Sequence, residues 1–154
     1  MDLLKLNYKF IIPLIPILFL YIFYNRNLNF SYFKDKSILI TGASSGIGKS
    51  ISEILNKNSN CELHLFARSF ENNKNGKVNK YKCDCSDYLS LKKIINEIDY
   101  IDIVINCAGA GDWKFLHEMD INEIQGCLNA PLISSLNLTH LTLPKMIKSN
   151  EGQM

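Results

Sequence analysis

The stretch TGASSGIG, residues 41–48, follows directly on the apolar run SILI at 37–40. Gly42 can adopt backbone angles that other residues avoid, and Gly46 and Gly48 lack the Cβ atoms that would block a pyrophosphate or close helix packing. The segment that follows, 46–58, has apolar residues on one helical face: Ile47, Ile51, Ile54 and Leu55. A helix that begins at such a turn presents free N–H groups and a positive dipole end to an anion. The stretch therefore predicts a strand at 37–41, a tight turn, and a helix at 46–58, which together bind phosphate groups.

Strands and helices alternate regularly beyond this turn. CELHLFA at 61–67 and VNKYKCD at 78–84 are predicted as strands, YLSLKKIINEI at 88–98 as a helix, and IDIVINCAG at 101–109 as a buried strand. Two more helices are expected near 120–129 and 132–149, with Pro131 at their junction and Pro144 as a candidate kink. This order predicts an α/β fold of the Rossmann type, a doubly wound parallel sheet, over residues 37–154.

Ligands of such sheets bind at the carboxyl ends of the strands. The glycine turn, ARS at 67–69 and NCAG at 106–109 all follow predicted strands. We therefore expect these three segments to meet at one site.

The run FIIPLIPILFLYIFY at 10–24 carries no charged side chain. As a helix it spans about 22 Å, short of a bilayer core of about 30 Å. Lys9 and Arg26 flank the run and can snorkel, and its tyrosines suit the membrane interface. We predict a single membrane anchor that contacts lipid through residues 10–24 and fits a thin membrane such as that of the endoplasmic reticulum.

Two other interpretations of this run stay open. One is a signal peptide, although no small-residue cleavage pattern follows, and the other is a buried core helix, which Pro13 and Pro16 would interrupt. The orientation is also open, because basic residues on the two sides nearly balance. Residues 1–9 are the expected N-terminal flank and 25–36 a polar linker. NFS at 29–31 and NLT at 137–139 match glycosylation sequons, which do not decide the topology.

The composition excludes some other kinds of site. The net charge is only +2 and the basic residues are scattered, which argues against nucleic-acid binding. No cysteine or histidine pair has zinc spacing, so no metal site is predicted. We expect reduced thiols at the five cysteines, Cys61, Cys83, Cys85, Cys107 and Cys127.

Four features in one order resemble the short-chain dehydrogenase/reductase family. They are T-G-x-x-x-G-x-G at 41–48, Asp84 after the third strand, N-x-A-G at 106–109, and Asn129 in the next long helix. The resemblance covers residues 37–154. Together with the membrane segment, the sequence is similar to the membrane-anchored branch of the family. It implies the interconversion of a carbonyl and an alcohol on a lipophilic substrate such as a steroid or retinoid, with a homodimer possible.

The resemblance also implies roles for individual residues. Asn129 would be catalytic, as the member of an Asn-Ser-Tyr-Lys set that orders a water. The residues that would bind the dinucleotide are Thr41, Gly42, Ser44, Ser45, Gly46, Ile47, Gly48, Arg68, Asp84, Cys85, Asn106, Ala108 and Gly109. Two alternatives stay open: Asp84 as the cap of the helix that follows it, and Asn129 as a helix-end residue before Pro131.

The second predicted strand ends in Ala67 and Arg68, where NAD-preferring sites usually have an acidic residue. An arginine can pair with the 2′-phosphate of NADP, and Ser44 could add a hydroxyl. The sequence therefore predicts NADP(H) as the cofactor. The alternative is that Arg68 is an ordinary surface charge.

The family's proton donor, the tyrosine of a Tyr-x-x-x-Lys motif, has no counterpart after Asn129. Only the pairs Tyr32/Lys36 and Tyr88/Lys92 have this spacing, and both precede Asn129. We therefore expect the first half of a catalytic domain, ending before the catalytic Ser, Tyr and Lys. Three hypotheses follow: an incomplete oxidoreductase, a membrane-tethered nucleotide-binding or regulatory half-domain without turnover, and a truncation that does not fold stably.

Overall fold

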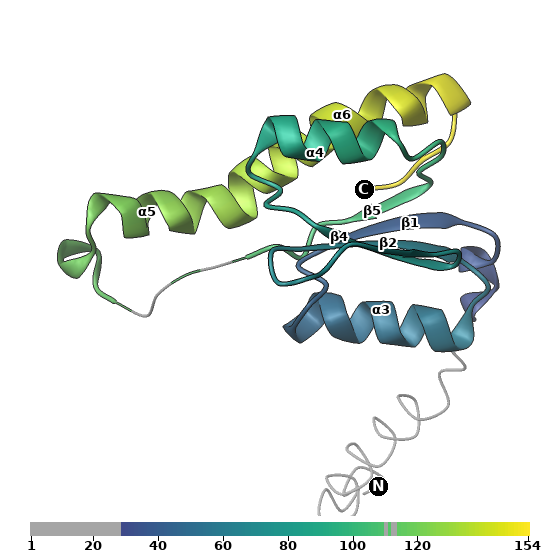
Figure 1. Ribbon diagram of the computed structural model, residues 1–154, viewed down its shortest axis with the longest axis horizontal. Coiled ribbons are helices and arrows are strands. Elements are labelled where there is room, and N and C mark those ends of the chain that lie inside the picture. Colours follow the sequence, from purple (N-terminus) through teal and green to yellow (C-terminus); the bar gives the residue numbers. More distant parts are fainter. Residues whose placement is uncertain (1–28, 110, 112–113) are drawn as a thin grey trace, which may run out of the picture.

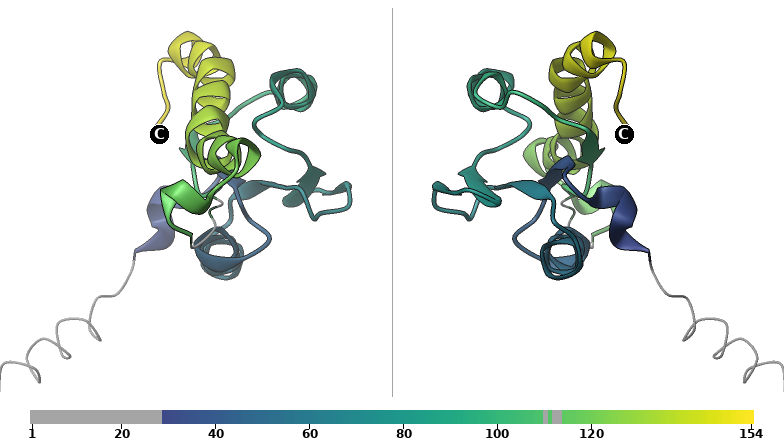
Figure 2. Two further views of the ribbon diagram at one scale, coloured as in Figure 1. Left: turned by 90° about the vertical axis from the view of Figure 1, so that its left-hand side faces the viewer. Right: turned by 90° about the vertical axis from the view of Figure 1, so that its right-hand side faces the viewer.

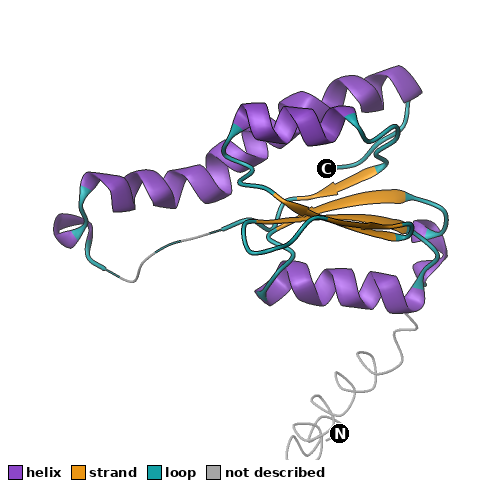
Figure 3. Cartoon of the chain, viewed as in Figure 1, coloured by secondary structure: helices purple, strands orange, loops and turns teal. Residues whose placement is uncertain are grey.

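A five-stranded sheet forms the centre of the computed structural model, which describes residues 29–109, 111 and 114–154. The strand order is β3-β4-β2-β1-β5. The strands, orange in Figure 3, lie between layers of helices. β1 (Ser37–Thr41) pairs in parallel with β2 (Glu62–Ala67) and with β5 (Ile103–Ile105). β4 (Val78–Lys82) is parallel to β2, and β3 (Asn73–Asn75) is an antiparallel edge strand. The sheet is therefore mixed, with a parallel centre.

Helices cover both faces of this sheet, as the doubly wound prediction requires (Figures 1 and 2). α3 (Gly46–Asn58) lies on one face. α4 (Tyr88–Asn96) and α6 (Ser134–Ser149) lie together on the other. α5 (Ile121–Leu128) continues the line of α6 beyond the sheet and has no buried residue (Figure 1). A short 3-10 helix, Leu116–Glu118, precedes α5.

The core consists of two layers separated by the sheet. Leu39 of β1 faces α4 and α6, where it packs with Phe66, Leu91 and Leu138, among others. Ile38 and Ile40 face α3 and pack with Leu55, Leu63 and Leu65, among others. These three β1 residues have no exposed surface, and burying each such side chain contributes about 1.5–3 kcal/mol. β1 is therefore the rigid centre from which the glycine turn emerges.

Three elements differ from the sequence prediction. β3 is not predicted, because its residues are polar and exposed. It pairs with β4 through a turn at Gly76, whose φ is +67°. β5 is shorter than the expected 101–109, because NCAG leaves the sheet. The helices near 120–129 and 132–149 are not separate: the π-helical turn Asn129–Ile133 joins them. That wider turn accommodates Pro131, which has no N–H and would clash in an ordinary α-helix.

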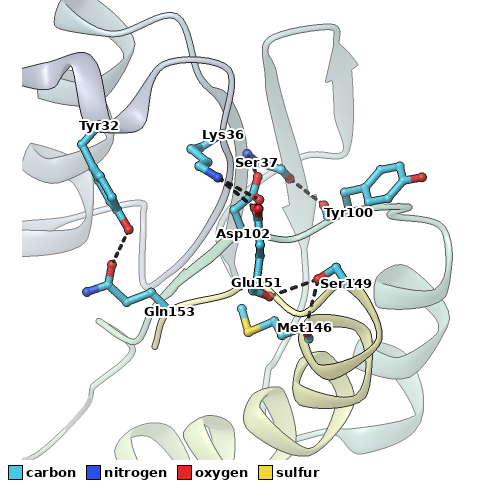
Figure 4. A network of polar contacts seen from close by, with 9 residues as sticks. All are labelled: Tyr32, Lys36, Ser37, Tyr100, Asp102, Met146, Ser149, Glu151 and Gln153. Carbon is cyan, nitrogen blue, oxygen red and sulfur yellow. Dashed lines mark hydrogen bonds and ion pairs between the residues drawn. The ribbon is translucent and has the colours of Figure 1, made fainter.

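Residues 29–36 dock on the domain rather than forming a free linker. The 3-10 helix Phe30–Phe33 packs its two end rings against the α3-side core. Lys36 lies 3.5 Å from Asp102 and 3.3 Å from Glu151, and Asp102 accepts a 2.7 Å hydrogen bond from the backbone N–H of Ser37 (Figure 4). These contacts fix the start of β1 at the amino ends of the strands.

The residues after α6 meet the same network. Tyr32 Oη donates a 3.0 Å hydrogen bond to the Gln153 side chain (Figure 4). The backbone of Gln153 bonds to Asp102 and Val104 at 2.9 Å, forming a parallel bridge beside β5. The outer edge of β5 therefore has a backbone partner at this position.

The predicted flank 1–9 and membrane anchor 10–24 lie outside the described residues. Among the helices of the described part, none is both long and apolar enough to cross a bilayer.

Candidate functional site

A cleft of about 730 Å³ opens at the carboxyl ends of β1, β2 and β4 and beside the residues that follow β5. It brings together residues from five segments that are far apart in the sequence. The predicted site residues among its lining are Gly42, Ser44, Ser45, Gly46, Ile47, Arg68, Asp84, Cys85, Ala108, Gly109 and Asn129. Of the predicted residues, only Thr41, Gly48 and Asn106 do not line it.

Thr41 lies beneath the cleft and joins two of its segments. Its side chain is fully buried, and its Oγ1 accepts hydrogen bonds of 3.0 Å from the backbone N–H groups of Cys107 and Ala108. These two N–H groups have left the β5 ladder and need another acceptor. Thr41 thereby holds NCAG against the glycine turn.

The three glycines of the turn serve different purposes. Gly42 has φ of +64°, and a Cβ there would lie 2.6 Å from the carbonyl oxygen of Cys107. Gly46 has φ of +54° but open space around it. Gly48 is helical and buried, and a Cβ there would lie 2.6 Å from the Gly42 carbonyl oxygen. Gly42 and Gly48 therefore permit close backbone contacts, and Gly46 permits the turn conformation.

The N-terminus of α3 opens into the cleft. Its N-cap, Ser45, has extended backbone angles, and its side chain does not cap the helix. Ser45, Gly46 and Ile47 are exposed, and the first turn of α3 contains no acidic residue. Backbone N–H groups and hydroxyls at this end are therefore available to an anion, with the helix dipole in the favourable direction.

Arg68 follows β2 at the same edge of the sheet. It is exposed, and within the described residues no hydrogen bond or ion pair holds its guanidinium. The carbonyl of its neighbour Ala67 accepts the N–H of Cys83 at 3.2 Å, which joins this turn to the one after β4. Ser69, the last residue of the predicted ARS segment, also lines the cleft. This corner of the cleft provides a cation, Arg68, and a hydroxyl, Ser69.

Asp84 is not the cap of the following helix. The N-cap of α4 is Asp87, which accepts from the N–H groups of Leu89 (3.1 Å) and Ser90 (3.2 Å). These bonds and that from the Ser90 hydroxyl hold the pKa of Asp87 below its ordinary value. Asp84 instead uses Oδ1 to accept from the N–H (2.9 Å) and hydroxyl (2.7 Å) of Ser86. No partner of its Oδ2 occurs in the described residues, so this oxygen can accept from a ligand.

Cys83 and Cys85 stand on either side of Asp84 and both line the cleft. They are 5% and 6% exposed. A hydrogen bond between the two thiols lowers the pKa of Cys83 and raises the pKa of Cys85, which burial raises further. Asn137 of α6 donates through Nδ2 to the carbonyls of Cys85 (3.2 Å) and Ser86 (3.0 Å). This amide is committed to the fold, so the second sequon is not available in the folded chain.

Asn129 begins the π-helical turn at the far wall of the cleft. Its side-chain oxygen accepts from Gln125 Nε2 at 3.1 Å. Its carbonyl accepts from the N–H of Ser134 and, at 3.1 Å, from the Ser134 hydroxyl. Ser134 is 2% exposed and also lines the cleft. Asn129 is therefore both the C-cap of α5 and the first residue of the π-helical turn that continues into α6.

Other predicted residues lie elsewhere. Asn106 is exposed and lines a separate hollow along β5, together with Tyr32 and Gln153. Of the two Tyr/Lys pairs with family spacing, Tyr88 packs against the ring of His140 on the α4–α6 side. Neither Tyr32 nor Tyr88 lines the cleft.

Several lining residues had no signal of their own in the sequence. Ser69 and Cys107 lie within the predicted ARS and NCAG segments but had no role of their own, and Ser86 is a near neighbour of Asp84 after the third predicted strand. Gly126 and Ser134 reach the cleft only because the π-helical turn keeps α5 and α6 in one line. No spacing rule for an α-helix predicts this.

The cleft is surrounded by a glycine turn, a free helix N-terminus and three further segments that follow strands. This arrangement is that of a Rossmann-type α/β domain. The family model for "short chain dehydrogenase" matches residues 36–154. The chain belongs to the short-chain dehydrogenase family.

The chain is 31% identical over 121 residues to a 3-ketodihydrosphingosine reductase of Bacteroides thetaiotaomicron, covering 76% of this chain and 44% of that protein. It is 32% identical over 135 residues to an NADP-dependent 3-hydroxy acid dehydrogenase of Schizosaccharomyces pombe. This match covers 77% of this chain and 52% of that protein. The chain thus spans about half the length of these curated relatives.

Solved structures show the same fold. A short chain dehydrogenase from Leptospira borgpetersenii with bound NAD+ superposes with a TM-score of 0.71 at 22% identity. The match covers 80% of this chain and 51% of that one.

Proposed function

We propose that the cleft binds NADP(H), as the nucleotide site of a short-chain oxidoreductase that interconverts an alcohol and a carbonyl. The observation that carries this proposal is the convergence of the glycine turn, Arg68, Asp84, the segment 107–109 and Asn129 on one cleft. The relatives named above are a reductase and a dehydrogenase, which supports the reaction type.

Each part of the cofactor has a matching group in the cleft. The N-terminus of α3 and the hydroxyls of Ser44 and Ser45 suit the pyrophosphate. The free oxygen of Asp84 suits the exocyclic amine of adenine, and Ala108 and Gly109 suit the nicotinamide ribose. The bound nicotinamide would supply or accept the hydride.

The preference for NADP(H) over NAD(H) rests on Arg68. Its guanidinium is exposed at the end of β2, where an acidic residue would favour the unphosphorylated ribose. The fission yeast relative is described as NADP-dependent, whereas the Leptospira structure contains NAD+. Arg68 supports the phosphorylated form because it can pair with the 2′-phosphate.

A second candidate function is favoured by the cleft lining itself. Among the described residues, no tyrosine or lysine lines the cleft, and the last tyrosine of the chain is Tyr100. Proton transfer to a carbonyl needs a positioned donor. We propose that these 154 residues bind the nucleotide without turning over substrate, as a nucleotide-binding half-domain.

The substrate class and location are the remaining parts of the proposal. We propose a lipophilic carbonyl or alcohol substrate, such as a steroid, retinoid or similar lipid. The apolar run at 10–24 supports this, as does the similarity to a 3-ketodihydrosphingosine reductase. We also propose a single-pass protein of the endoplasmic reticulum membrane. A homodimer is supported by exposed leucines along α5 and α6, Leu128, Leu132 and Leu136.

Affinities of the full-length chain for NADPH and NADH test the cofactor assignment. Arg68→Glu should weaken NADPH binding by at least about tenfold, or 1.4 kcal/mol, and leave NADH binding nearly unchanged. Lys57→Glu makes the same charge change at the opposite end of α3 and should alter neither affinity. Equal preference for NADPH in the wild type and Arg68→Glu would refute the assignment.

Turnover is tested separately. The 154-residue chain, mixed with NADPH and a panel of lipophilic ketones, should consume no NADPH. Carbonyl-dependent consumption would show that the chain contains its own proton donor.

A further inference from the structure

Two aspartates stand just before α4, and each accepts a hydrogen bond from the hydroxyl of a serine a few residues further on. Asp87 uses both of its oxygens within the fold: Oδ1 accepts from the N–H groups of Leu89 and Ser90, and Oδ2 accepts from the Ser90 hydroxyl at 2.5 Å. Asp84 uses only Oδ1, which accepts from the N–H and the hydroxyl of Ser86 at 2.9 and 2.7 Å. The Asp84–Ser86 pair lines the cleft, and the other pair does not. In the described structure, the pair in the cleft therefore leaves one carboxylate oxygen for a ligand.

The backbone that carries Asp84 is held by two other elements. The N–H of Cys83 donates to the Ala67 carbonyl at the end of β2 at 3.2 Å. Asn137 of α6 donates through Nδ2 to the Ser86 carbonyl at 3.0 Å. The Asp84 side chain is exposed, so removing the Ser86 hydroxyl would leave it one hydrogen bond and let it turn about its own torsions. The Ser86 hydroxyl therefore fixes the direction of the free carboxylate oxygen.

We propose that Ser86 is a positioning residue that aims Oδ2 of Asp84 at the purine of the cofactor, and so selects a 6-amino purine over a 6-oxo purine. This inference rests on the proposed nucleotide site. An ionised carboxylate can only accept hydrogen bonds, so it pairs with the exocyclic amine of adenine. The 6-oxo group of hypoxanthine or guanine is itself an acceptor and gives the carboxylate no donor at that position.

The test compares NADPH with reduced nicotinamide hypoxanthine dinucleotide phosphate, which has an oxo group in place of the adenine amine. Both are titrated into the full-length chain, and the ratio of the two Kd values is measured. The wild type should prefer NADPH by at least about tenfold, because the amine bonds to a charged group. Ser86→Ala should weaken NADPH binding about threefold, because binding must then order the Asp84 side chain, and should leave the affinity for the hypoxanthine cofactor unchanged. Ser86→Thr keeps a hydroxyl and should restore the wild-type ratio.

Ser90→Ala is the matched control, because it removes a serine hydroxyl from the neighbouring aspartate outside the cleft. It should lower the urea midpoint of unfolding and leave the Kd ratio unchanged. An unchanged Kd ratio in Ser86→Ala, even with both affinities lowered, would assign Ser86 a structural role only and overturn the proposal. Equal affinities of the wild type for the two cofactors would overturn it too, while the nucleotide site itself would stand. If the wild type binds neither cofactor, the proposed function and this inference both fail.

Discussion

Thr41→Val tests how the glycine turn and the NCAG segment are joined. Valine has nearly the shape of threonine, so the buried packing around residue 41 is kept. The substitution removes the oxygen that accepts the N–H groups of Cys107 and Ala108, both at 3.0 Å. In the described structure neither N–H has another acceptor.

The expected loss follows from these two bonds. Leaving a buried donor without a partner costs about 1–3 kcal/mol. Cys107 and Ala108 are only partly buried, so water replaces part of the interaction and each lost bond should cost about 1 kcal/mol. We expect the free energy of unfolding to fall by about 2 kcal/mol for both bonds together. For a domain of this size that corresponds to a fall in Tm of roughly 7 °C.

Thr142→Val is the matched control. Thr142 is also fully buried, but its hydroxyl only donates at 2.8 Å to the Leu138 carbonyl, one helical turn back. That carbonyl keeps its backbone partner, so the cost should stay below about 0.5 kcal/mol. Urea unfolding of the full-length chain, followed by circular dichroism, measures both variants. Equal stability of the wild type and Thr41→Val, or equal losses in the two variants, would refute this account of Thr41.

Three further predictions use other parts of the structure. Gly48→Ala should lower the free energy of unfolding by about 2 kcal/mol, because its Cβ would lie 2.6 Å from the Gly42 carbonyl oxygen. Gly46→Ala has open space around it and should lower it by about 1 kcal/mol, because of the positive φ alone. Urea midpoints that rank the two variants in reverse would contradict this geometry. Asp87→Asn should lower the urea midpoint more than Asp84→Asn, because Asp87 is the charged N-cap of α4. Asp84→Asn should weaken NADPH binding more than Asp87→Asn. Urea unfolding and titration calorimetry that show the reverse would refute these separate roles for the two carboxylates. Burial lowers the pKa of His64 in the folded chain below its ordinary value of 6.5. Between these two pKa values the unfolded chain binds more protons, so the free energy of unfolding should fall as the pH decreases from about 6.5. A His64→Gln variant that loses stability just as steeply over this range would show that His64 is not the cause.

The parts of the fold with strong local signals could be predicted from the sequence. β1 and α3 have the predicted bounds, 37–41 and 46–58. In that stretch three features predict the same elements: an apolar run, a glycine turn, and apolar residues at helical spacing. The meeting of distant site residues was also predictable, because parallel strands align their carboxyl ends.

The rest depends on tertiary contacts that no local pattern reveals. β3 is polar and exposed and exists only as a pair with β4. The choice of Asp87 over Asp84 as helix cap depends on where the turn at Ser86 ends. Pro131 indicated a break, but the π-helical turn keeps Asn129 in a continuous helix beside the cleft. The docking of residues 29–36 depends on Lys36 and Asp102, which are far apart in the sequence.

The proposed reaction, the cofactor preference and the selection of adenine all depend on the binding of a dinucleotide in the cleft. Isothermal titration of the full-length chain with NADPH measures that binding. We predict saturable binding of one NADPH per chain, which Gly42→Ala abolishes because its Cβ would meet the Cys107 carbonyl at 2.6 Å. An absence of saturable binding to the wild-type chain, or unchanged binding to folded Gly42→Ala, would contradict the account.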